Sequence, residues 1–122
     1  MSDKSFATSL SCMDGRVQLP MINLIKEKYS VDFVDTITAP GIDKVIFDGN
    51  IESIKKSVMI SVSNHKSSHI VISGHFGCAG NPVSDEEHFT HIKKSVEIVN
   101  SWNLDADVIG VWIDEKFVPH LI

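Results

Sequence analysis

Short apolar runs alternate with amphipathic segments along the sequence, and this alternation limits the folds open to the chain. Strand-like runs lie at residues 6–12, 31–37, 69–74 and 108–113, and residues 116–121 could return as a short edge strand. The run at 31–37 is rich in β-branched and aromatic residues. Apolar residues recur at helical spacing in three segments. The first follows Pro20, the second begins at Ile51 and the third begins at Ser84. Strands that alternate with helices typically form a parallel sheet with right-handed crossovers. The sequence predicts a single α/β domain, residues 1–122, with a mainly parallel sheet of four or five strands flanked by helices.

The segment from Ser84 is predicted to be the longest helix. Ser84 and Glu87 have the spacing of a capping box, in which each side chain bonds a free backbone N–H at the start of a helix. One side of this helix carries apolar residues down to Trp102, so that side is expected to pack on the sheet. His88 and His91 are expected on the opposite, solvated side, without a role as ligands.

Length and charge exclude several classes of protein. The 122 residues suffice for a sizeable core, and 16 acidic against 11 basic side chains give a formal charge of −5. Basic residues form no cluster larger than a pair, which argues against nucleic acid and anionic membranes as partners. No stretch approaches the ~20 apolar residues of a membrane span, and the N-terminus lacks the apolar core of a secretion signal. A cytoplasmic location is therefore expected.

Residues that can bind a metal ion or take part in catalysis follow the first and third predicted strands. The first strand ends in Cys12-Met13-Asp14-Gly15-Arg16, and the third ends in Gly74-His75-Phe76-Gly77-Cys78. In open α/β sheets, ligands bind beyond the carboxyl ends of the strands. If the two strands are neighbours, two thiols and an imidazole meet there, and this is a donor set suited to Zn²⁺. The same residues have simpler interpretations, because a lone cysteine is often a buried apolar residue and an Asp–Arg pair often braces a turn.

Asp14 and Arg16 suggest how the fourth metal position is controlled. Asp14 could occupy that position and close the site, or a water could occupy it and leave the site open for catalysis. Arg16 lies two residues beyond Asp14, and a bidentate pair between them would hold the carboxylate off the metal. Asp14 could then orient a zinc-bound hydroxide, which forms near pH 7 and suits a small electrophile such as carbon dioxide.

These motifs resemble those of the β-class carbonic anhydrases. That family has a Cys-x-Asp-x-Arg turn after its first strand and a His-x-x-Cys turn after a later strand. The matching residues here are Cys12, Asp14, Arg16, His75 and Cys78. The resemblance implies that Cys12, His75 and Cys78 bind zinc, that Asp14 and Arg16 form the catalytic dyad, and that the reaction is reversible hydration of carbon dioxide to bicarbonate. It also implies a homodimer or a higher homo-oligomer.

The sequence departs from the family pattern in places that leave other functions open. Family members usually carry a helical arm before the first strand, whereas eleven residues precede Cys12, so the arm is expected to be missing. Ala39-Pro40-Gly41 stands where the family usually has an Arg-Asn-Ala-Gly loop. One alternative is a non-catalytic zinc module in which Asp14 stays on the metal. Another is hydrolysis of a sulfur analogue such as carbonyl sulfide.

Overall fold

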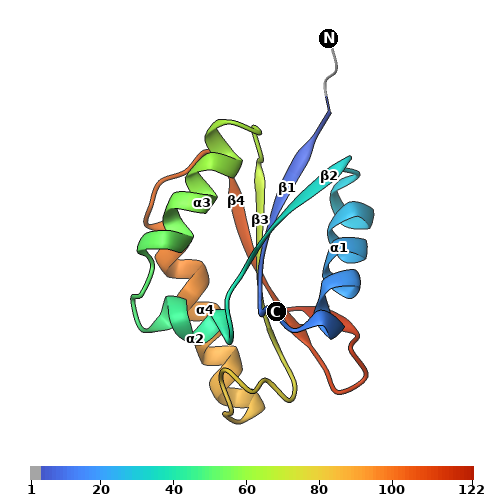
Figure 1. The fold of residues 1–122 in the computed structure, drawn as a ribbon, viewed down its shortest axis with the longest axis vertical. Helices are drawn as coiled ribbons and strands as arrows, with labels where there is room; N and C mark the ends of the chain where they lie inside the picture. Colours follow the sequence, from blue (N-terminus) through green and yellow to red (C-terminus); the bar gives the residue numbers. More distant parts are fainter. Residues whose placement is uncertain (1–3) are drawn as a thin grey trace.

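A five-stranded sheet forms the centre of the fold (Figure 1). The structure is a computed structural model, and it describes residues 4–122. The strand order is β2-β1-β3-β4-β5, and all neighbours are parallel except β5, which runs antiparallel to β4. The strands are β1 (Phe6–Ser11), β2 (Phe33–Thr38), β3 (His69–His75), β4 (Asp107–Ile113) and β5 (Pro119–Leu121). The predicted fold class, a mainly parallel sheet flanked by helices, is confirmed.

Helices cover both faces of the sheet. They are α1 (Gly15–Tyr29), α2 (Ile42–Phe47), α3 (Glu52–Ser63) and α4 (Asp85–Asn100). Helix α1 packs on one face, and α2, α3 and α4 pack on the other (Figure 1). The side chains on the α1 face include Val17, Met21 and Val71, and those on the other face include Ile46, Val58 and Ile72. All six are fully buried, and this two-sided burial explains why β3 has a nearly continuous apolar sequence.

Two helix starts follow from capping side chains. Ser84 Oγ accepts a hydrogen bond from the Glu87 N–H (3.2 Å), so the predicted start of α4 is confirmed. Helix α1 begins at Gly15, earlier than the predicted segment after Pro20, and Pro20 lies inside it. The reason is that Asp14 caps this helix by accepting from the Arg16 N–H (2.9 Å). The start of α1 is therefore built from the same residues as the candidate site.

Helix α2 was not predicted, and it changes the surroundings of α4. It is six residues long and follows Pro40-Gly41, which reads as a loop in the sequence. It packs against α4, and as a result both His88 and His91 are buried. The expectation that these histidines lie on a solvated face is wrong, because both belong to the buried side of α4 together with Ile92, Ser95 and Val99. On that side His88 contacts Trp112 of β4 and His91 contacts Phe47 of α2.

Among residues 4–122, no helix has the length and apolar character that crossing a membrane requires.

Candidate metal centre

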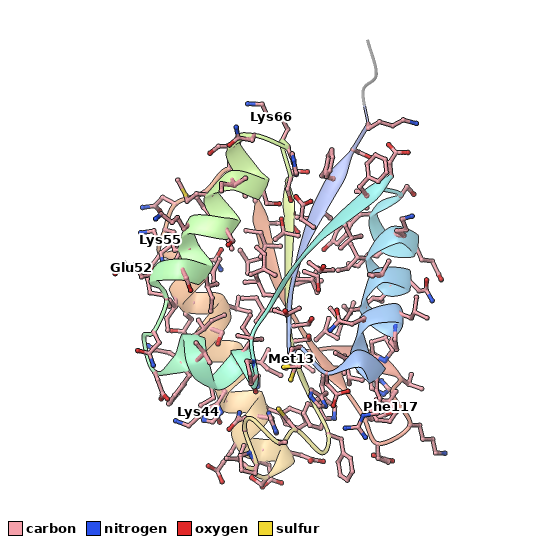
Figure 2. All side chains as sticks on the ribbon, in the orientation of Figure 1. Met13, Lys44, Glu52, Lys55, Lys66 and Phe117 are labelled. Carbon is pink, nitrogen blue, oxygen red and sulfur yellow. The ribbon has the colours of Figure 1, made fainter. Side chains whose placement is uncertain are left out.

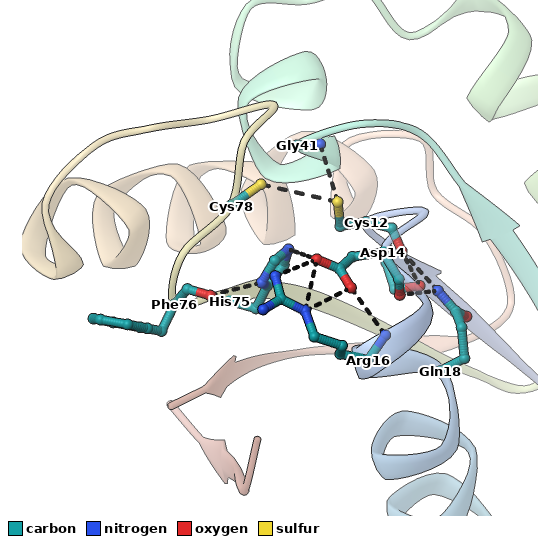
Figure 3. Close-up of polar contacts among 9 residues, drawn as sticks. Cys12, Asp14, Arg16, Gln18, Gly41, His75, Phe76 and Cys78 are labelled. Carbon is teal, nitrogen blue, oxygen red and sulfur yellow. Dashed lines mark hydrogen bonds and ion pairs between the residues drawn. The ribbon is translucent and has the colours of Figure 1, made fainter. Parts of the chain in front are cut away.

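Neighbouring strands bring the three predicted donor side chains together. Cys12 directly follows β1, and His75 is the last residue of β3, which pairs with β1 in parallel. Cys78 lies in the loop after β3 and returns toward Cys12 (Figure 3). The donor atoms of the three residues all lie within 4.8 Å of one another. The side chains are almost fully buried, with exposed fractions of 6% for Cys12, 1% for His75 and 4% for Cys78.

The imidazole of His75 is oriented by a single hydrogen bond. Its Nδ1 donates to the carbonyl oxygen of Phe76 (2.9 Å), which fixes the proton on that nitrogen. Nε2 consequently carries a free lone pair, and it is buried without a hydrogen-bond partner in the described part of the chain. An unsatisfied buried acceptor costs free energy unless something binds it. Metal-ligating histidines commonly use this arrangement, with one nitrogen bonded to the protein and the other free.

The two sulfur atoms are spaced as a tetrahedral zinc site requires. Cys12 Sγ and Cys78 Sγ lie 3.9 Å apart as free thiols. Two Zn–S bonds of about 2.3 Å at a tetrahedral angle would separate the sulfurs by roughly 3.8 Å. Burial, with a contribution from the nearby Cys12, raises the pKa of Cys78 to about 11, although the N–H groups of Asn81 and Gly80 oppose this. Two sulfurs and one imidazole nitrogen with a free lone pair therefore fit a zinc ion in both chemistry and spacing.

Asp14 and Arg16 form a close pair beside these donors (Figure 3). Arg16 donates from Nη2 to Asp14 Oδ2 (2.7 Å) and from Nε to Asp14 Oδ1 (3.1 Å). These side-chain bonds, followed by the bond from the Arg16 backbone N–H, hold the pKa of Asp14 well below its ordinary range. Asp14 Oδ2 lies 4.0 Å from His75 Nε2. An ionised carboxylate thus lies at the edge of the donor cluster, held there by Arg16.

The structure adds two contacts to this site that the sequence did not reveal. Gln18 Nε2 donates to the carbonyl oxygens of Cys12 (2.8 Å) and Asp14 (3.1 Å), which braces the turn between β1 and α1. The Gly41 N–H points at Cys12 Sγ at 3.4 Å. The position of Gln18, four residues after Asp14, is a signal that could have indicated the first contact. Nothing local to Gly41 indicates the second, because it depends on how the loop after β2 folds back.

Two backbone segments touch where the loop carrying Cys78 meets the loop after β2. A Cβ atom at Gly80 would lie 2.6 Å from the carbonyl carbon of Pro40 and 2.7 Å from the Gly41 nitrogen. Contacts this short with backbone atoms leave no space for a side chain. Glycine at this position therefore sets the path of the loop that carries Cys78.

Replacing Gly80 with alanine is expected to destabilise the protein. The added methyl must push the two backbones apart, and overpacking of this kind costs about 1–3 kcal/mol. Gly15→Ala is the matched control, because no atom of the part of the chain that the structure describes lies within 4 Å of a Cβ at that position. The control should change the free energy of unfolding by less than about 0.5 kcal/mol. Urea unfolding of both variants measures the difference, and equal stabilities would show that the Gly80 contact is not tight.

A buried polar cluster lies behind the same loop. His88 Nδ1 donates to Asp43 Oδ2 (2.6 Å), and both side chains are at most 2% exposed. The Asn81 amide lies between the two histidines and donates from Nδ2 to His91 Nδ1 (3.0 Å). Since Asn81 is three residues beyond Cys78, this cluster ties the loop to α2 and α4. The sequence offered no signal for it, because Asp43 belongs to the helix that was not predicted.

Replacing Asp43 with alanine should lower the free energy of unfolding by about 1–3 kcal/mol, because His88 would remain buried without its acceptor. Asp48→Ala is the control on the same segment. It removes an exposed ion pair with Lys44, and such pairs contribute about 0–1 kcal/mol. Thermal or urea unfolding compares the two variants. Equal losses would argue that the Asp43–His88 bond contributes no more than a surface pair.

Comparison with known proteins identifies the family. The chain belongs to the putative carbonic anhydrase family, whose sequence model matches residues 2–122. Similar solved structures include β-carbonic anhydrase isoform I from the protozoan Trichomonas vaginalis, with 17% identity and a TM-score of 0.71 over 100% of this chain and 85% of that one. The β-carbonic anhydrase CafA of the fungus Aspergillus fumigatus has 14% identity and a TM-score of 0.64, covering 98% of this chain and 76% of its own.

A second protein of the same fungus, the β-carbonic anhydrase CafD, has 14% identity and a TM-score of 0.62, over 100% of this chain and 91% of that one. No curated protein matches the sequence. The predicted family resemblance is confirmed, and the low identities mean that the solved structures support the fold alone.

Proposed function

We propose that the chain is a zinc-dependent carbonic anhydrase that hydrates carbon dioxide reversibly to bicarbonate as one domain spanning residues 1–122. Cys12, His75 and Cys78 would hold the zinc ion. Zinc in this position supplies a nucleophile at neutral pH, because it lowers the pKa of water to about 7. The observation that carries the proposal is the buried Nε2 of His75, which has no hydrogen-bond partner among residues 4–122 and lies within 4.8 Å of two thiol sulfurs.

Asp14 and Arg16 would control access to the fourth metal position. Arg16 engages both carboxylate oxygens of Asp14, and Asp14 also caps α1 through the Arg16 N–H. Turning the carboxylate onto the metal would break these bonds, and the loss of an N-cap alone costs about 1 kcal/mol. This cost favours the open form of the site over a closed form in which Asp14 is the fourth ligand.

The same pair would orient the attacking water. The ionised Asp14 has a lone pair available toward the donor cluster, since its Oδ2 lies 4.0 Å from His75 Nε2. By accepting a hydrogen bond from the water, Asp14 would align the oxygen lone pair with the carbon of the substrate. Arg16 keeps Asp14 ionised and in place during this step.

The test is hydration of carbon dioxide by zinc-loaded protein. Stopped-flow measurements with a pH indicator between pH 7 and 9 should give a rate above that of buffer, and the rate should scale with protein concentration. A rate equal to buffer in protein with one zinc per chain would contradict the proposal. The same preparation assayed with carbonyl sulfide determines which of the two substrates is preferred.

Arg16→Gln distinguishes an enzyme from a non-catalytic zinc module. In an enzyme of the proposed type, losing the guanidinium releases Asp14, so hydration should fall while the zinc content is retained. In a structural module, neither the zinc content nor the melting temperature depends on Arg16. Lys44→Gln, on the surface of α2, controls for the loss of one positive charge.

Self-association is part of the proposal. Strand β2 is an edge strand, and its first residue, Phe33, is 49% exposed. An exposed edge with an aromatic side chain favours pairing with another chain. Light scattering coupled to size-exclusion chromatography should give a mass of twice the monomer or more, and a monomeric mass at all concentrations would contradict it.

A further inference from the structure

The turn between β4 and β5 lies beside the Asp14–Arg16 pair. Strand β4 ends at Ile113, which pairs with His75, and the Ile113 carbonyl oxygen accepts from the Phe76 N–H (2.9 Å). The turn that follows, residues 114–118, therefore leaves the sheet next to the donor cluster. Figure 1 shows this hairpin, in red, next to the first turn of α1, and Figure 2 labels Phe117 on it. Phe117 has no role in the proposed reaction so far.

Asp114 holds the turn in one conformation. Its Oδ1 accepts from the N–H groups of Lys116 (2.9 Å) and Val118 (3.0 Å), and its Oδ2 accepts from His120 Nε2 (2.7 Å). The backbone carbonyl of Asp114 also accepts from the Phe117 N–H (2.9 Å). The bond from His120, followed by those from the two backbone N–H groups, lowers the pKa of Asp114. The turn is thus fixed by a network of its own.

Phe117 has an unfavourable backbone conformation in this turn. Its φ is +59°, in the left-handed region that glycine or asparagine usually occupies and that is strained for a bulky residue. A contact of the ring offers a reason for phenylalanine here. The Arg16 Cζ atom lies 4.9 Å from the ring centroid, over the face of the ring, within the range of a cation–π interaction.

Arg16 has few other partners. Its side chain is 57% exposed, and within residues 4–122 only Asp14 forms hydrogen bonds with it. Hydrogen bonds to one partner at the end of a long flexible side chain do not define the conformation of the whole Arg16 side chain. The ring of Phe117 provides a second contact, on the face of the guanidinium plane, and two contacts of different kinds define its orientation.

We propose that Phe117 is a positioning residue for Arg16, and that its ring holds the guanidinium where it can grip Asp14. The inference rests on the proposed function, in which Arg16 controls Asp14. If so, the β4–β5 hairpin helps to position the residues of the proposed active site. Arg16 then stays beside the site even when Asp14 turns away.

The test compares Phe117→Leu with Phe117→Tyr in zinc-loaded protein. Leucine keeps apolar bulk but lacks the aromatic face, whereas tyrosine retains it. In the native protein, NMR should show ring-current shifts of the Arg16 Hδ protons, which leucine should abolish and tyrosine should preserve. Phe117→Leu is expected to lower kcat/KM roughly two- to fivefold, the factor that corresponds to an exposed cation–π contact, and Phe117→Tyr should restore it at unchanged zinc content.

The control is Val118→Ala, the neighbouring exposed apolar residue on the same turn, which should leave the Arg16 signals and the rate unchanged. The inference is overturned if the native protein lacks ring-current shifts at Arg16, or if the tyrosine variant behaves like the leucine variant. Because the NMR measurement needs no activity, it tests the contact between Phe117 and Arg16 even if the native protein fails to hydrate carbon dioxide. A native protein that does not hydrate carbon dioxide would count against the proposed function, and not against this contact.

Discussion

Replacing His75 with alanine is expected to abolish stoichiometric zinc binding. The imidazole supplies one of three proposed ligands, and its Nε2 is the buried acceptor that lacks any other partner in the described chain. Residues that merely support a ligand cost 10–100-fold in metal affinity when they are changed. Loss of a ligand itself should exceed about a hundredfold. Purified protein should then contain well under one zinc per chain by elemental analysis, and competition with a chelator gives the change in Kd.

His65→Ala is the matched control for this experiment. His65 is half-exposed, bonds Asp35 and stacks on Phe6, which begins β1, whereas Cys12 follows the end of that strand. The His65→Ala substitution should leave the zinc content unchanged, which distinguishes the loss of a ligand from the loss of any histidine. A full complement of zinc in His75→Ala would remove His75 from the ligand set and with it the basis of the proposed function.

Replacing Asp14 with asparagine should reduce hydration of carbon dioxide roughly 10- to 100-fold, because asparagine lacks the ionised carboxylate that would orient the attacking water. Asparagine is as good an N-cap as aspartate, so α1 should keep its start and the melting temperature should change little. The zinc content should also be retained. Stopped-flow kinetics therefore measures the loss of the carboxylate separately from any loss of fold or metal.

Asp48→Asn is the corresponding control, since it changes the same chemical group in an exposed ion pair on the surface. Its hydration rate should equal that of the native protein. If Asp14→Asn also retained the native rate, Asp14 would be a helix cap alone. The Asp–Arg pair would then brace the turn, the simpler interpretation that the sequence left open.

The sheet could be predicted from the sequence because its strands have short-range patterns, and the meeting of the two motifs could be predicted on the condition that their strands are neighbours. Short strand-like runs predicted four of the strands to within about two residues. The geometric condition for the site, that the strands before Cys12 and before His75 are neighbours, is met in the structure. Parallel strands with intervening helices have few possible orders, and in this one their carboxyl ends converge at the donor side chains.

Other features depend on tertiary packing and were missed for that reason. Helix α2 has only six residues and follows a Pro-Gly loop, so local propensity gives it almost no signal. The error over His88 is a consequence of the same omission, because the partner that makes its burial favourable, Asp43, lies on α2. The contact between Phe117 and Arg16 was also missed, since it joins residues about a hundred positions apart through a left-handed backbone conformation.

The separation of Cys12 and His75 along the chain has a consequence for folding. Sixty-two residues lie between them, and they include three helices and most of two strands. An ion held by both would act as a reversible cross-link, closing a loop that contains half of the protein. Because that loop opens when the chain unfolds, the heat-denaturation midpoint should rise with the supply of free metal, by an amount corresponding to about 2.7 kcal/mol at a hundred times Kd.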